Sequence, residues 1–196
     1  MKLFIFDLGQ VMITNLRILP NMADALGLDY QEFHEDYKIY DIPLLDGWMD
    51  PEDYYRHLEL KFGVKVEEDL FITSFSPKVN TRLLAIVDRL REKGFRCVVG
   101  SNVFDKHWDY TLAMPEAPLS HFDALYASPL MHRSKPEPCF FRHIQETEGV
   151  PFNEIAFIDD RAENIATAES LGITTLHYAG DRLEEREKAF FAPYLA

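Results

Sequence analysis

Three short apolar runs of this sequence each end at polar residues of types that act on anionic substrates. Asp7 follows the first run, Ser101 and Asn102 follow the second, and Asp159 and Asp160 follow the third. A carboxylate can attack an electrophile, and hydroxyl and amide groups can donate hydrogen bonds to an anion. Paired carboxylates are ligands for a hard divalent cation. The set predicts nucleophilic chemistry on an anionic substrate beside a metal ion.

A carboxylate nucleophile and an anionic substrate repel each other unless both charges are screened. We expect Mg²⁺ and the ammonium group of Lys135, which precedes a predicted helix, to screen Asp7 during attack on phosphorus. Mg²⁺ takes oxygen ligands in octahedral geometry and keeps several waters. Three carboxylates and one backbone carbonyl would therefore suffice as protein ligands of the ion. The carboxylates would be those of Asp7, Asp160 and Asp159. The sequence predicts Mg²⁺ as cofactor and a small phosphorylated metabolite as substrate.

The apolar runs before these residues are expected to be strands of one parallel sheet. Short continuous apolar runs are typical of strands that are buried on both faces. The expected strands are residues 3–6, 97–99, 155–158 and 173–177, with a weaker fifth at 124–127. The carboxyl ends of parallel strands share one edge of the sheet, so their polar residues should meet in one cleft.

Helical patterns lie between the expected strands. One apolar helix face runs over residues 83–90, with Asn80 as N-cap and Gly94 as the stop. A second helix is expected to begin at Pro136, and a third to cover residues 162–171. Strands that alternate with helices predict a doubly wound, Rossmann-like α/β fold.

Residues 15–78 break this alternation, because they contain helix starts but no convincing strand. Two pairs of acids resemble helix capping arrangements, namely Asp29 with Glu32 and Asp50 with Asp53. Pro51, directly after Asp50, is at a favoured first position of a helix. We interpret the segment as a small helical cap, inserted after the first strand into a core of residues 1–14 and 79–196. Such an insertion projects from the carboxyl end of the strand, where it can cover a ligand.

Four segments of the chain together resemble the motifs of haloacid dehalogenase-like hydrolases. They occur in the family's order and span nearly the whole sequence, with a small cap after the first. They are Phe4-Ile5-Phe6-Asp7-Leu8-Gly9-Gln10-Val11, Val98-Val99-Gly100-Ser101-Asn102, Ser134-Lys135-Pro136-Glu137-Pro138 and Phe157-Ile158-Asp159-Asp160-Arg161-Ala162-Glu163-Asn164.

The resemblance implies a role for each conserved position of the catalytic centre. Asp7 would become an aspartyl-phosphate, and Lys135 would hold both this nucleophile and the phosphate. Ser101 and Asn102 would bind the phosphoryl group that is transferred. The resulting reaction is Mg²⁺-dependent phosphatase chemistry, with a sugar phosphate as the expected substrate.

The resemblance also implies a metal site at the same strand ends. Asp159 and Asp160 would anchor Mg²⁺ together with Asp7, and the backbone carbonyl of Gly9 would be a further ligand. Asn164 stands where many relatives carry a second acid, and it would orient the metal site through its neighbours.

Gly9 departs from the usual phosphatase pattern. Phosphatases of this superfamily carry a second Asp at that position, which protonates the leaving group. Loss of a positioned acid costs about 10² to 10⁴ in rate. The Asp-Leu-Gly form nevertheless resembles a small-capped branch that includes glucose 1-phosphate phosphatase, and an anomeric phosphate releases an oxygen that needs less protonation.

Two other functions are compatible with these residues. A 2-haloacid dehalogenase would use the same Asp7 nucleophile without a metal, but the Asp159-Asp160 pair would then hinder an anionic substrate. A catalytically weak or silent phosphometabolite-binding protein would keep the pocket and lack turnover because of Gly9.

Composition excludes several other classes of protein. The chain has 196 residues, 47% of them hydrophobic, and a formal net charge of −13, so nucleic acid and anionic membrane surfaces are unfavourable partners. No apolar run reaches the roughly 20 residues of a membrane span, and we expect a cytoplasmic protein. The two cysteines, Cys97 and Cys139, are expected to be packing residues. Within the cap, Trp48 is the aromatic residue that we expect to face the cleft and select the substrate.

Overall fold

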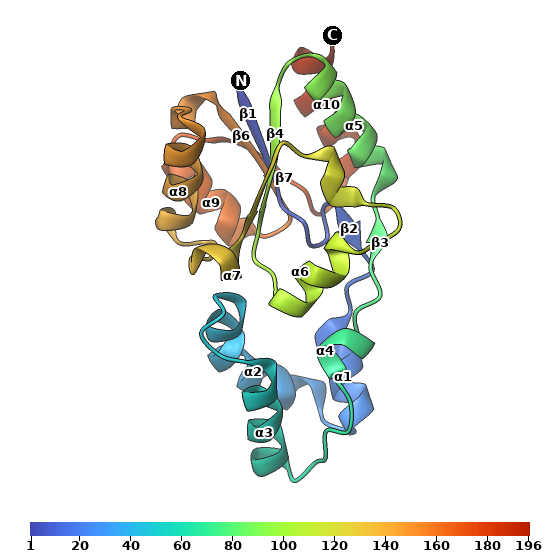
Figure 1. The fold of residues 1–196 in the computed structure, drawn as a ribbon. Coiled ribbons are helices and arrows are strands. Elements are labelled where there is room, and N and C mark those ends of the chain that lie inside the picture. The colour runs from blue at the N-terminus through green and yellow to red at the C-terminus, as the bar shows by residue number, and fades with distance from the viewer.

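The computed structural model describes residues 1–196, and its centre is a five-stranded parallel sheet. The strand order is β5-β4-β1-β6-β7, which places the N-terminal strand in the middle (Figure 1). The strands are β1 (Leu3–Phe6), β4 (Arg96–Ser101), β5 (Ala124–Ala127), β6 (Ile155–Asp159) and β7 (Thr174–His177). All five predicted strands are therefore present, the weak fifth included.

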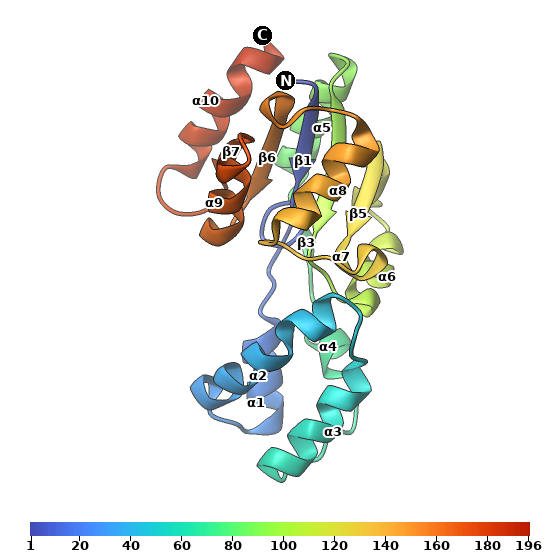
Figure 2. The same ribbon diagram turned by 90° about the vertical axis from the view of Figure 1, so that its left-hand side faces the viewer.

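Helices cover both faces of the sheet (Figure 2). Phe4 and Phe6 of β1 point to one face, while Leu3 and Ile5 point to the other, and all four are fully buried in two separate core clusters. The first face is covered by α5 (Thr81–Glu92) and α10 (Leu183–Leu195), and the second by α8 (Pro138–Glu148) and α9 (Ala162–Ser170). The predicted doubly wound α/β fold is confirmed.

The helical insertion after the first strand is also present, below the sheet in Figure 1. Its helices are α1 (Ile18–Leu26), α2 (Tyr30–Leu45), α3 (Pro51–Phe62) and α4 (Leu70–Thr73). They enclose a core of their own around Phe33, Tyr54 and Phe71. A two-stranded ribbon of β2 (Ile13–Thr14) and β3 (Lys78–Val79) connects the insertion to the sheet. The predicted domain division at residues 15 and 78 falls at this ribbon and stays a prediction.

The remaining helices lie where the core meets the cap (Figure 1). They are α6 (Asp105–Leu112) and α7 (Ser128–Met131), and 3₁₀ turns at Pro118–His121 and Phe152–Glu154 complete the core. Lys106 of α6 bonds Glu52 and Asp69 of the cap, both at 2.6 Å. Ser128 of α7 donates a hydrogen bond to the carbonyl of Leu45 at the end of α2. The cap is thus fixed to the core on both sides.

Helix boundaries follow the local signals at most positions. Asn80 accepts a hydrogen bond from the Leu83 amide, as an N-cap should, and the helix that it begins ends before Gly94. The prediction that a helix begins at Pro136 is wrong, because α8 begins at Pro138. A residue before proline avoids helical backbone, and Glu137 is accordingly extended.

Two smaller expectations also fail. The side chain of Asp50 makes no capping hydrogen bond, although α3 begins with Pro51 as expected. Cys97 is buried in the core, but Cys139 is exposed on α8, so only one of the two cysteines is a packing residue. Hydrophobic periodicity predicted the helix that contains Cys139, but it did not show that this residue lies on the solvent-exposed face.

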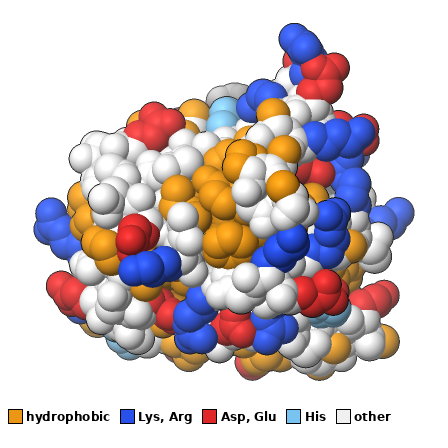
Figure 3. Space-filling view, turned by 90° about the horizontal axis from the view of Figure 1, so that it is seen from above, with side chains coloured by type: hydrophobic (Ala, Val, Ile, Leu, Met, Phe, Trp, Pro, Cys, Tyr) orange, Lys and Arg blue, Asp and Glu red, His pale blue; other side chains and the backbone are white.

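The surface carries charges of both signs. Figure 3 looks onto the end of the core farthest from the cap, where Lys and Arg side chains are as prominent as acidic ones around a small apolar patch. The acidic excess is therefore not concentrated on this face. None of the helices combines the length and the apolar character that crossing a bilayer requires.

Candidate active site

Lys135 lies at the centre of the polar cluster at the strand ends. Its ammonium nitrogen donates hydrogen bonds to Asp7 Oδ1 and Asp159 Oδ2, both at 2.7 Å, and to the Gly100 carbonyl at 2.9 Å. The side chain is 1% exposed. The cluster joins the ends of β1, β4 and β6 because the sheet places β1 between the other two strands. A buried ammonium held by three acceptors fixes the carboxylate of Asp7.

The buried charges at this site do not balance. Burial raises the pKa of Asp7 to about 7, and Asp159 and Asp160 add to the rise while Lys135 opposes it. Burial and the charge of Asp159 likewise raise the pKa of Asp160. Burial by itself would lower the pKa of Lys135, but Asp159 and Asp7 outweigh it and leave this pKa above its usual value. One ammonium thus only partly compensates three carboxylates.

Asp159 and Asp160 differ in what their carboxylates contact. Oδ1 of Asp159 accepts hydrogen bonds from the Arg161 amide at 2.8 Å and from Asn164 Nδ2 at 3.0 Å. Its Oδ2 accepts from Lys135 and Asn164, so both oxygens are engaged. Asp7 and Asp160 line the cleft, whereas Asp159 lies behind them. Asn164 therefore positions Asp159, and its role toward a metal ion stays a prediction.

The donor set fits a hard divalent cation. One carboxylate oxygen from each of Asp7, Asp159 and Asp160 lies within 4.8 Å of the others. Asn164 Oδ1 is buried without a hydrogen-bond partner beside them, and Asn164 also lines the cleft. Oxygen donors, excess negative charge and an unpaired buried acceptor are the conditions that Mg²⁺ or a Mg²⁺-bound water would satisfy.

Ser101, the last residue of β4, and Asn102, which follows it, contribute in a different way from that expected. The side-chain amide of Asn102 bonds the backbone of Lys135 twice: Nδ2 donates to its carbonyl and Oδ1 accepts from its amide, both at 2.8 Å. Ser101 is buried, and its hydroxyl donates to the Asn102 carbonyl at 3.2 Å. Asn102 lines the cleft and Ser101 does not. Within this structure Asn102 positions Lys135, and phosphate binding by the pair stays a prediction.

A cleft of about 480 Å³ opens above these residues, between the core and the cap. Its floor includes Asp7, Gly9 and Lys135, and its cap wall is formed by one face of α2 and by Ile18 and Leu19 at the start of α1. The α2 residues on that wall are His34, Tyr37, Lys38, Asp41 and Leu45, which follow helical spacing. Gly9 lies in the cleft as expected, at the position where the usual second Asp is missing.

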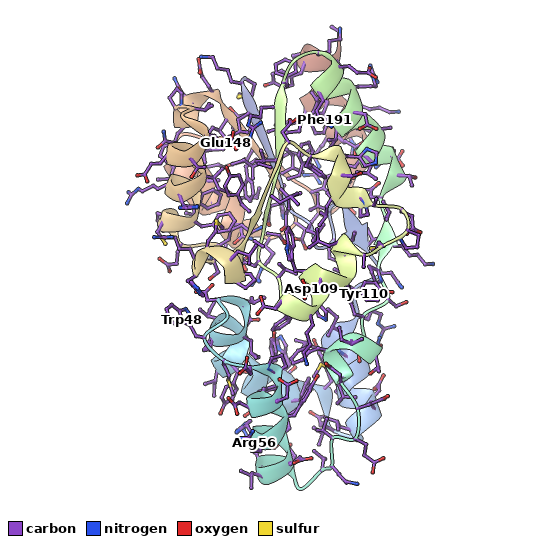
Figure 4. All side chains as sticks on the ribbon, in the orientation of Figure 1. Trp48, Arg56, Asp109, Tyr110, Glu148 and Phe191 are labelled. Carbon is purple, nitrogen blue, oxygen red and sulfur yellow. The ribbon has the colours of Figure 1, made fainter.

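Trp48 is not brought to the cleft. Its side chain is 70% exposed, and its ring packs on that of His132 at 5.0 Å. Figure 4 shows Trp48 on the outer side of the molecule where the cap meets α7. The structure therefore does not place Trp48 at the cleft where we expected it, and the preceding Gly47, at φ +67°, lies beside Pro129 of α7. Tyr54 and Tyr55 are buried in the cap, as aromatic packing residues.

Several residues of the site were not recognised in the sequence. Arg161, directly after Asp160, lines the cleft. His177, at the end of β7, lies 2.9 Å from the Asp160 carbonyl through Nε2. Its position at a strand end was the available signal. The α2 wall had no such signal, because its polar residues also fit a solvated helix face.

The fold and site define a class of protein with a doubly wound α/β core, a buried lysine between carboxylates and a cluster of acids that could hold a cation under a helical cap. A family model for haloacid dehalogenase-like hydrolases matches residues 1–172. The chain belongs to the haloacid dehalogenase-like hydrolase family.

Individual relatives agree with this class. The chain is 22% identical over 187 residues to the sesquiterpene phosphatase astK of Aspergillus oryzae, covering 90% of this chain and 89% of that protein. A structure of a predicted HAD-like family hydrolase from Porphyromonas gingivalis is 25% identical, with a TM-score of 0.80 over 97% of this chain and 98% of that one. The HAD family enzyme bt-2542 of Bacteroides thetaiotaomicron, in complex with magnesium and inorganic phosphate, is 27% identical, with a TM-score of 0.73 over 90% and 93% of the two chains.

Proposed function

We propose that this hydrolase is a Mg²⁺-dependent phosphatase of a small polar phosphomonoester, with a sugar phosphate as the substrate class. The observation that carries the proposal is the buried contact of Lys135 with Asp7 and Asp159 on the floor of a cleft that Asp160 also lines. The magnesium and phosphate bound to bt-2542 support the same chemistry.

The chain's own residues account for both halves of a phosphoryl transfer. A carboxylate oxygen of Asp7 attacks phosphorus, and the leaving oxygen departs with the electron pair of the P–O bond. Lys135 holds the nucleophile in place and neutralises part of the charge that develops. Mg²⁺, held by Asp7, Asp160 and Asp159 with the Gly9 carbonyl, would screen the remaining negative charge. Water then cleaves the aspartyl-phosphate while the cap limits the access of bulk solvent.

The character of the cleft supports a polar leaving group. Only five of its sixteen lining residues are hydrophobic, and the cap wall offers His34 and Asp41 as hydrogen-bonding partners. An apolar leaving group would desolvate these groups without replacing their hydrogen bonds. A polyhydroxylated group replaces them, so a sugar phosphate is favoured over a terpenoid phosphate such as the name of astK indicates.

The same charges disfavour the dehalogenase alternative. A 2-haloacid is an anion, and it would enter a cleft whose floor holds Asp7 and Asp160, with Asp159 directly behind. The single ammonium of Lys135 is already bonded to two of these carboxylates. A phosphatase of this kind would bind a divalent cation that compensates these negative charges, whereas a dehalogenase would act without a metal ion.

The proposal is tested by phosphate release from hexose phosphates, other small phosphomonoesters and a terpenyl phosphate, with Mg²⁺ or with a chelator. Wild-type protein should release phosphate only with Mg²⁺, and Asp7→Asn should lower the rate at least about 10³-fold, because the nucleophile is removed. Asp24→Asn, an exposed substitution in the cap, is the control and should retain the wild-type rate.

Three outcomes would contradict parts of this proposal. Dechlorination of a 2-haloacid in the presence of chelator would favour the dehalogenase. Tight binding of a sugar phosphate without product release would favour a silent binder. Faster release from the terpenyl phosphate than from any hexose phosphate would overturn the substrate class alone.

A further inference from the structure

The missing acid at Gly9 leaves the leaving oxygen without an obvious proton donor on the floor of the cleft. Space is not the reason for its absence. A Cβ built on Gly9 meets only Leu16 Cδ1, at 3.5 Å, and Gly9 is not in the left-handed region. The neighbouring Gln10 cannot replace an acid, since an amide has no proton to transfer at neutral pH and its Nε2 already donates to the Leu16 carbonyl.

Asp41 is the acid that the cap contributes to the cleft. The three carboxylic acids among the lining residues are Asp7, Asp160 and Asp41, and the first two belong to the nucleophile and the cation site. Asp41 is half-buried on α2, opposite the floor. It lines the cap wall of the cleft whose floor holds Asp7, and a leaving group that departs away from Asp7 would move toward this wall.

Asp41 lies nearer the core end of α2 than the other titratable residues of its face. The carboxyl end of α2 touches the core, where the Leu45 carbonyl accepts from Ser128. At about 1.5 Å per residue, Asp41 lies about 6 Å along the helix from that contact and His34 about 16 Å. Lys38 lies between them, and its ammonium pairs with Glu35 on the outer side.

The face of α2 that carries Asp41 is held in place from behind. Asp36, on the opposite side of the helix, is buried and accepts hydrogen bonds from His57 Nε2 at 3.0 Å and Lys61 at 2.6 Å. Both donors belong to α3, so α2 cannot rotate without leaving the buried Asp36 carboxylate without its hydrogen-bond partners. The orientation of Asp41 toward the cleft is thus fixed by the cap itself.

The neighbours of Asp41 suit a carboxyl group that gains and loses a proton. Burial raises its pKa, while hydrogen bonding with Tyr37 and the charges of Arg161 and His34 oppose the rise. Arg161 is bonded to Glu163, so it acts on Asp41 through space and does not lock it as a carboxylate. The charges of Arg161 and His34 also stabilise the carboxylate once the acid has given up its proton.

We infer that Asp41 of the cap is the general acid of the phosphoryl transfer, in place of the side chain that is absent at Gly9. The inference rests on the proposed phosphatase function. As Asp7 forms its bond to phosphorus, the bond from phosphorus to the leaving oxygen breaks, and that oxygen takes the proton of Asp41. The Asp41 carboxylate then takes a proton from the water that attacks the aspartyl-phosphate, which returns Asp7 to a carboxylate and Asp41 to its acid form.

The test compares two esters that differ in their need for a proton. An alkyl ester such as hexose 6-phosphate has a poor leaving group, whereas p-nitrophenyl phosphate releases a stable phenolate. Asp41→Asn should lower kcat/KM for hexose 6-phosphate about 10²-fold more than for p-nitrophenyl phosphate, because only the alkoxide depends on general acid catalysis. Asp41→Glu should recover part of the difference, and Asp24→Asn should show none.

A second variant tests the proton transfer independently of cap structure. Adding Gly9→Asp to Asp41→Asn supplies a carboxyl group on the floor, and it should restore hydrolysis of hexose 6-phosphate relative to p-nitrophenyl phosphate. Equal losses on both esters in Asp41→Asn, or no loss on either, would overturn the role of Asp41 while leaving the phosphatase intact. No Mg²⁺-dependent hydrolysis of p-nitrophenyl phosphate by the wild type would overturn the proposed function, and this inference with it.

Discussion

At the scale of single residues, Lys135 shows how strongly this site depends on one buried charge. Its ammonium is 1% exposed and lies between two carboxylates, whereas a surface pair would be solvated by water. Removing it leaves Asp7 and Asp159 buried without a counter-charge. Loss of one partner of a buried ion pair is strongly destabilising for this reason.

We therefore expect Lys135→Met, which keeps the length of the side chain, to lower the free energy of unfolding by about 3–5 kcal/mol. Lys106→Met is the matched control, since Lys106 also contacts two carboxylates but is 32% exposed, and it should cost about 1 kcal/mol or less. Urea denaturation measures both. Similar losses in the two variants would contradict the burial argument.

At the scale of elements, Gly100 explains how β4 reaches the site. A Cβ at Gly100 would lie 2.7 Å from Ile5 Cγ2 and 3.3 Å from Ile144 Cδ1. Only glycine lets β4 pack this closely between β1 and α8. The carbonyl of Gly100 is consequently placed to accept from Lys135.

Gly100→Ala should lower the free energy of unfolding by about 1–3 kcal/mol, because the added methyl group overpacks the core. Gly9→Ala is the matched control: its new Cβ meets only Leu16, at an ordinary contact distance, so the change should stay within about 0.5 kcal/mol. Thermal or urea unfolding compares the two. A larger loss for Gly9→Ala would show that the backbone at Gly9 is constrained by something other than contact.

At the scale of the whole molecule, His107 couples the stability of the cap–core junction to pH. It is buried on α6, its Nε2 bonds the Phe71 carbonyl of the cap at 2.7 Å, and its ring stacks on Phe75 at 4.1 Å. Burial lowers its pKa below the usual 6.5, although the Phe71 carbonyl opposes this. The unfolded chain therefore binds a proton here at a higher pH than the folded protein does.

It follows that the contribution of His107 to stability is present above about pH 6.5 and is lost as the pH falls from there toward its lower folded pKa. His107→Gln keeps a hydrogen-bond donor without a titrating group. We expect the free energy of unfolding of the wild type, relative to that of the variant, to be lower at pH 5.5 than at pH 7.5. Urea denaturation of both proteins at the two pH values measures this. A difference independent of pH would contradict this prediction.

Most of the floor of the cleft could be predicted from the sequence because the strand ends that form it are encoded locally, whereas Lys135 was expected from the motif around it. An apolar run specifies a buried strand, and the polar residue after the run lies at its carboxyl end. A parallel sheet then places Asp7, Asn102 and Asp160 at one edge without further information. The division of labour between Asp159 and Asp160 depends on which hydrogen bonds form around them, and spacing does not encode this.

The upper wall of the cleft was decided by tertiary structure. Asp41 lies there because Asp36 bonds His57, 21 residues away, and the Leu45 carbonyl accepts from Ser128, 83 residues away. Such contacts set the rotation and height of α2, and they leave no periodic pattern in the sequence. Trp48 was misplaced for the same reason. The sequence by itself determined which chemistry lies on the floor, since strand ends are local features, and only the packing of distant segments decided which residues face it.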